Sequence, residues 1–91
     1  MFIHIGEGKV LSKKNIIGIF DLETTSISKK TREFLRINEK KGNVEYVSAE
    51  IPKTYIITDS KLRKKVYVTQ ISSQTLQKRA ERNDSIGTEN Q

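Results

Sequence analysis

The chain has 91 residues, of which 34% are hydrophobic. A domain of this size buries only about 60 to 65% of the surface that its unfolded chain exposes, so we expect a single domain with a thin core. With no Cys and one His, the sequence has no disulfide and lacks the usual ligands of a structural metal site. Self-association is therefore the expected additional source of stability.

The charge balance favours an acidic partner. Seventeen Lys and Arg face eleven Asp and Glu, which gives a net charge of +6. Nucleic acid is the commonest such partner, while anionic lipid and an acidic protein surface stay open. No apolar run approaches the roughly 18 residues of a membrane span, and no charged-then-apolar leader begins the chain. We expect a cytoplasmic protein without a membrane partner.

The N-terminal residues predict a β-hairpin. Phe2–Ile5 alternates around apolar positions and ends at Gly6–Gly8, whose glycines suit a tight turn. Lys9–Leu11 is then predicted to pair back on the first strand. The polar residues Ser12–Asn15 predict a bend.

The most continuous apolar and β-branched stretch is Asn15–Glu23, which predicts a buried strand around which the rest of the chain is organised. Phe20 is expected to be buried in it. Gly18 indicates either a bulge or the close approach of another backbone.

A helix is predicted from about Lys29 to Lys41, with Ser28 as its N-cap and Gly42 just past its end. Its apolar stripe at helical spacing consists of Phe34, Leu35 and Ile37. Its basic side chains are Lys29, Lys30, Arg32, Arg36, Lys40 and Lys41.

The second half of the chain predicts more strands. Val44–Val47 is a short one, and Pro52 marks a strand entry or an edge. The β-rich runs Thr54–Thr58 and Lys65–Thr69 predict a hairpin with a long basic tip at Asp59–Lys64.

A last short helix is predicted over Gln74–Arg82, capped by Ser72 or Ser73, with one apolar face formed by Leu76 and Ala80. Residues 83–91 are polar and without periodicity, which predicts a disordered tail. The chain therefore predicts one α+β domain over residues 1–82, with a small, mostly antiparallel sheet, one central helix and a short C-terminal helix.

Catalysis finds little support in the residues. The single histidine, His4, lies in an alternating strand, where an ordinary structural role is far commoner than a role as ligand or base. Gly6–Gly8 is too short for a phosphate-binding loop. We expect no enzyme activity, no cofactor and no metal.

Basic clusters carry more weight, although a charged face is often only solvated. Besides the helix, they lie at Lys13–Lys14 and at the hairpin tip, where Lys61, Arg63, Lys64 and Lys65 follow one another closely. The few aromatic residues look like core or strand residues, which argues against a base-stacking platform. The sequence has no helix-turn-helix or zinc-finger spacing.

Three segments together resemble a known family. They are Phe2–Gly6 (FIHIG), Ile16–Asp21 (IIGIFD) and Ser72–Ala80 (SSQTLQKRA), and the likeness covers about residues 1–82. The chain resembles the RemB (YaaB-like) branch of the RemA/RemB extracellular matrix regulatory family of Gram-positive bacteria. The resemblance implies a cytoplasmic transcription regulator of biofilm-matrix genes, with a LytTR-like fold, that is not an enzyme. It also implies ring-like homo-oligomers that present basic residues to double-stranded DNA.

The resemblance also places the candidate contacts. A bend position that is arginine in RemA-type proteins corresponds to Asn15, and an arginine-rich segment corresponds to Glu50–Lys53, where only Lys53 is basic. Two alternatives follow: DNA binding has moved to the hairpin tip and the helix, or the protein is a non-DNA-binding module that partners a RemA-type regulator. The candidate DNA-binding residues are Lys13, Lys14, Asn15, Lys53, Lys61, Arg63, Lys64 and Lys65.

Overall fold

The computed structural model describes the backbone of residues 1–22 and 29–89, with side chains described up to residue 81. In chain order, its elements are β1 (Phe2–Gly6), β2 (Lys9–Ser12), the 3₁₀ turn η1 (Lys13–Asn15), β3 (Ile16–Asp21), α1 (Lys29–Lys40), β4 (Val44–Tyr46), β5 (Thr54–Asp59), β6 (Lys64–Thr69) and α2 (Ser73–Glu89). Neither helix, over these described residues, is long and apolar enough to cross a membrane.

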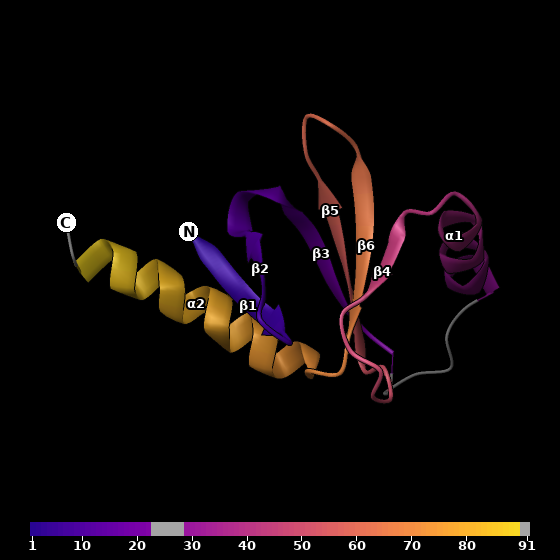
Figure 1. Ribbon diagram of the computed structural model, residues 1–91. Coiled ribbons are helices and arrows are strands. Elements are labelled where there is room, and N and C mark those ends of the chain that lie inside the picture. Colours follow the sequence, from indigo (N-terminus) through magenta and orange to yellow (C-terminus); the bar gives the residue numbers. More distant parts are fainter. Residues whose placement is uncertain (23–28, 90–91) are drawn as a thin grey trace.

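Four strands form the main sheet in the order β3-β5-β6-β4, and β1 and β2 form a separate antiparallel hairpin. Within the main sheet β5 pairs antiparallel with β3 and β6, whereas β4 runs parallel to β6. The β1–β2 hairpin and α2 lie on one side of the main sheet, and α1 lies on the other (Figure 1). The predicted α+β class is confirmed, with a sheet that is mixed because of β4.

The larger core lies between the main sheet and the layer formed by the hairpin and α2. Alternation along β1 turns Ile3 and Ile5 inward, where both are fully covered. The remaining buried members of this cluster are Leu11, Ile56, Tyr67 and Leu76. The Thr69 hydroxyl of β6 donates to the Ile5 carbonyl, which fastens the hairpin to the sheet.

A smaller cluster lies on the opposite face of the sheet, where Tyr55, Val66 and Val68 are buried and Leu35 of α1 packs against them. The other apolar residues of the helix stripe, Phe34 and Ile37, remain 38% and 43% exposed, because α1 contacts the sheet mainly beside β4.

The sequence predicted residues at both ends of α1. The Tyr46 hydroxyl donates to the Glu39 carboxylate over 3.0 Å and ties β4 to α1. The predicted helix end is confirmed: Gly42 has φ +74° and its N–H donates to the Glu39 carbonyl, as in a Schellman-type end. The predicted N-cap, Ser28, lies outside the described residues.

The prediction of a buried central strand at Asn15–Glu23 is wrong. The strand observed there, β3, lies at the edge of the sheet and none of its residues is fully buried. Ile19 packs against the larger core, while Phe20 lies on the other face and stacks on Tyr55 with ring centroids 5.0 Å apart. The strand is apolar because it contacts both layers, but the lack of an outer neighbour leaves each side chain partly exposed. The central strands are β5 and β6.

Phe20 is consequently 42% exposed, not buried as expected. The predicted bulge is confirmed, since the β3–β5 register shifts between Ile16 and Gly18. A Cβ at Gly18 would lie 2.3 Å from a ring carbon of Phe20, so only glycine leaves room for this ring over the strand.

The predicted cap of α2 is also confirmed, because the Ser72 hydroxyl accepts the N–H of Thr75. The helix is longer than expected: its backbone continues past Arg82 to Glu89. No proline interrupts this segment, so helical hydrogen bonding can extend through it.

Candidate nucleic-acid interface

The bend η1 lies at the same end of the sheet as the loop between β5 and β6. This follows from the pairing of Ile16, the first residue after the bend, with Thr58, near the end of β5. The bend is firmly held: the Lys13 N–H donates to the Met1 carbonyl over 2.9 Å, and the Lys13 ammonium donates to the Ala80 carbonyl of α2 over 3.2 Å.

The β5–β6 loop is a hydrogen-bonded turn organised by Ser60. The Ser60 N–H donates to the Arg63 carbonyl over 3.2 Å, and the Ser60 hydroxyl accepts the N–H groups of Leu62 and Arg63. This arrangement projects the intervening side chains outward, so that Leu62 is 93% exposed. Lys61, Arg63 and Lys64 are exposed beside it.

A hollow of about 220 Å³ separates the bend from this loop and is called the tip hollow below. Its lining comes from β2, η1, β5, the loop and β6, and comprises Leu11, Ser12, Asn15, Thr58, Ser60, Leu62, Arg63, Lys65 and Tyr67. The structure therefore brings three predicted site residues, Asn15, Arg63 and Lys65, around one concavity.

Lys65 is engaged in an internal charge network. Its ammonium lies 2.7 Å from one Glu45 carboxylate oxygen, and the Lys9 ammonium lies 3.4 Å from the other. Both ammonium groups also lie over the Tyr67 ring, 5.1 and 5.3 Å from its centroid. The hydrogen bond from Lys65 holds the pKa of Glu45 below its usual value, and the same bond raises the pKa of Lys65. Both charges are thereby stabilised in the fold.

Four other cations at this end are exposed and have no ion pair among the described residues: Lys14, Lys61, Arg63 and Lys64. Together with Asn15 they are called the tip surface. Of the predicted contacts, Lys13 and Lys65 lie at the same end but use their ammonium groups within the fold, as described above.

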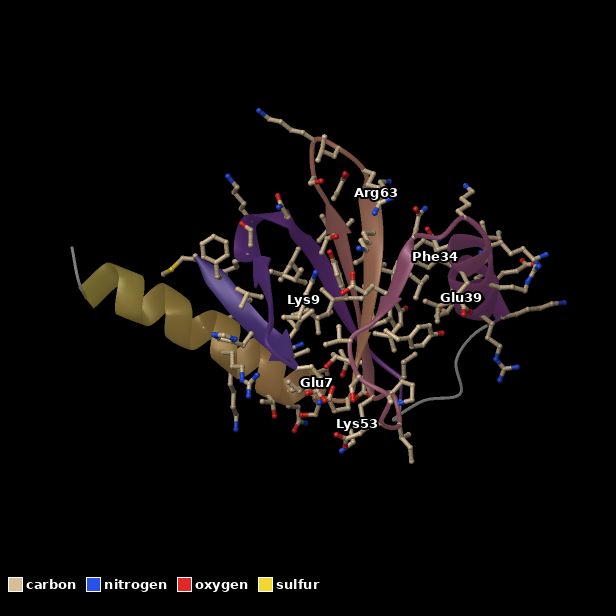
Figure 2. The ribbon with its side chains drawn as sticks, viewed as in Figure 1. Glu7, Lys9, Phe34, Glu39, Lys53 and Arg63 are labelled. Carbon is tan, nitrogen blue, oxygen red and sulfur yellow. The ribbon has the colours of Figure 1, made fainter. Side chains whose placement is uncertain are left out.

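Lys53 does not join them. It precedes β5, at the opposite end of the sheet from Arg63 (Figure 2), and its N–H donates to the Thr69 carbonyl over 3.0 Å. A second, shallow hollow there is lined by Glu50, Ile51, Lys53 and Gln70. Helix α1, which carries another set of basic residues, lies on the far side of the sheet from the hairpin (Figure 1). One copy of the chain thus carries its basic residues on separate surfaces.

The sequence did not identify the residues that determine which of these cations are paired within the fold. Glu45 is the carboxylate that pairs with both Lys65 and Lys9, and Ser12 contributes a hydroxyl to the tip hollow. The alternation of Lys65 and Tyr67 along one strand indicates that the two share a face. The parallel register that brings Glu45 opposite Tyr67 has no comparable local signal.

Comparison with known proteins agrees with the resemblance noted above. Residues 2–80 match the family model described as RemA-like, Extracellular matrix regulatory protein A-like. The chain is also 36% identical over 81 residues to Extracellular matrix regulatory protein B of Bacillus subtilis (strain 168), an alignment that covers 89% of this chain and 91% of that protein. The chain belongs to the RemA-like family of extracellular matrix regulatory proteins.

Proposed function

We propose that the protein regulates transcription of extracellular matrix genes in the cytoplasm by binding double-stranded DNA through the tip surface. The observation that carries the proposal is that Lys14, Lys61, Arg63 and Lys64 lie exposed at one end of the sheet, without counter-ions among the described residues. Contacts with DNA phosphates require exposed Lys or Arg side chains that are long enough to reach the backbone, and such contacts position a protein on a duplex.

A single copy would bind weakly, so we propose that it acts as a homo-oligomer. Four neutralised phosphates give a salt slope of only about −3.6 per copy, at about −0.9 for each phosphate. Copies joined into one assembly raise the apparent affinity without any new contact. The edge strand β3, with Ile17 61% and Phe20 42% exposed, offers an unpaired ladder and apolar side chains for such assembly.

Fluorescence anisotropy with labelled promoter DNA over a salt series tests DNA binding, and light scattering under the same conditions gives the number of subunits. Arg63→Glu combined with Lys64→Glu should abolish binding at moderate salt. Lys29→Glu combined with Lys30→Glu changes the net charge equally on the other side of the sheet. This matched control should retain most of the affinity, because screening limits charge effects to roughly 8–10 Å. Equal losses in both variants, or no binding by the folded wild type at low salt, would refute the tip surface.

A second function is favoured by the opposite end of the sheet. There Ile51 is 83% exposed beside Glu50. An exposed apolar side chain next to a carboxylate suits contact with a protein better than contact with phosphates. The alternative proposal is therefore an interaction module that partners a RemA-type regulator. Co-purification of the two proteins, lost on Ile51→Glu and kept on Arg63→Glu, would favour it, particularly if the chain alone binds no DNA.

A further inference from the structure

The tip hollow contains polar groups that the fold does not use. Thr58 donates to the Lys65 carbonyl, and the Ser60 hydroxyl is occupied by its own loop. In contrast, the side chains of Ser12, Asn15 and Arg63 have no hydrogen-bond or ionic partner among the described residues. These three groups come from two segments far apart in the sequence and line the same concavity.

Arg63 is the cation of the hollow that has no ion-pair partner among the described residues. Lys65 also lines the hollow, but its ammonium is paired at 2.7 Å with Glu45, a carboxylate that it shares with Lys9. The residues that line the hollow, all of which the structure describes, include no Asp or Glu. An anion entering the hollow would therefore meet one guanidinium without an ion-pair partner among the described residues, and no carboxylate in the lining.

The shape of the hollow limits what that anion can be. A volume of about 220 Å³ lies below the roughly 300–1,000 Å³ of pockets for drug-sized ligands, so the ligand is small. Leu11, Leu62 and Tyr67 supply apolar lining beside the polar groups. Leu62 is 93% exposed, so a bound ligand with an apolar or aromatic body would bury more of its apolar surface than that of the other lining residues.

We propose that the tip hollow binds the phosphoryl group of a small phosphorylated ligand of mononucleotide size or less. The planar Arg63 guanidinium suits two-point binding of a phosphoryl group, and Asn15 and Ser12 can donate to its remaining oxygen. Because Arg63 also belongs to the tip surface, the bound ligand competes with DNA. That competition rests on the proposed DNA binding, whereas binding of the ligand does not.

NMR titration of the full chain, without DNA and at constant ionic strength, tests the site with inorganic phosphate, adenosine 5′-monophosphate and adenosine. We expect saturable shifts from both phosphates, centred on Asn15 and residues 60–63, and none from adenosine. Arg63→Gln should weaken phosphate binding at least tenfold. Lys40→Gln removes an equal charge from α1, on the other side of the sheet, and should change binding less than twofold. Backbone spectra of both variants confirm that they are folded.

Each other outcome counts against the site. Equal affinity of Arg63→Gln and the wild type, equal loss in both variants, equal shifts with adenosine, or no saturable binding would overturn it. A competition experiment separates the two proposals. If the monophosphate binds but no DNA does at any salt concentration, the proposed function fails and the phosphate site stands. If DNA binds and neither phosphate does, the phosphate site fails and the proposed function stands. If saturating monophosphate leaves the DNA affinity unchanged, the competition fails and the proposed function again stands.

Discussion

Phe20→Ala and Leu76→Ala form a pair that tests the observed layering of the domain. Leu76 of α2 is fully covered in the larger core, so its truncation should cost about 2.5–5 kcal/mol. Phe20 is a little over half covered. Half of the roughly 1.5–3 kcal/mol available from full burial, plus about 0.5–1.5 kcal/mol for stacking on Tyr55, gives about 1.3–3 kcal/mol.

Urea unfolding followed by circular dichroism measures both costs, at concentrations where light scattering finds no assembly. In thermal unfolding, each kcal/mol corresponds to about 4–8 °C for a domain of this size. The expected order is a clearly larger loss for Leu76→Ala than for Phe20→Ala. An equal or larger loss for Phe20→Ala in the unassembled protein would mean that β3 is a buried central strand after all, and would refute the edge position.

Three further predictions concern single residues. The pKa of Glu45 is lowered, so its contribution to stability is present above the unfolded value of 4.5 and is lost as the pH falls through the lowered folded value. Glu45→Gln should therefore reduce the loss of stability between pH 7 and pH 3, measured by urea unfolding, by at most about 1 kcal/mol. An unchanged pH dependence would contradict the hydrogen bond from Lys65. Gly42→Ala should cost about 1–2 kcal/mol because φ is +74°, whereas Gly42→Asn should cost less; equal melting temperatures of all three proteins would refute the helix end. Leu62→Ser should change stability by no more than about 0.5 kcal/mol, and a larger loss in thermal unfolding would place Leu62 inside the fold.

Local patterns predicted most of the elements. The glycines of Gly6–Gly8 and Gly42 were sufficient for a turn and a helix end, because both require the backbone conformations that glycine adopts easily. The β-branched runs around the β5–β6 loop predicted its hairpin. Which strands lie at the centre of the sheet and which lie at its edge was not predictable in this way. An apolar run such as β3 has the same sequence pattern in two situations. It can be a fully buried strand between two neighbouring strands, or an edge strand that is partly covered by the packing layers on both faces of the sheet.

The candidate site was predictable only as a set of basic residues. Charge alone could not distinguish Lys65, which pairs with Glu45, from Arg63, which pairs with no described residue. It also could not separate Lys53, at the far end of the sheet, from the tip surface (Figure 2). These distinctions depend on contacts between residues 20 or more positions apart, which the register of the sheet decides.

Two hydrogen bonds made by Lys13 have a practical consequence for handling the protein. They attach the bend to the Met1 carbonyl and to Ala80 of α2, so the position of Asn15 depends on the first residue and on the C-terminal helix. A purification tag fused before Met1 would sit beside the tip surface, and shortening α2 to before Ala80 would remove the hydrogen bond between the Lys13 ammonium and the Ala80 carbonyl. A tag placed after α2, whose far end projects away from the sheet (Figure 1), leaves both anchors in place.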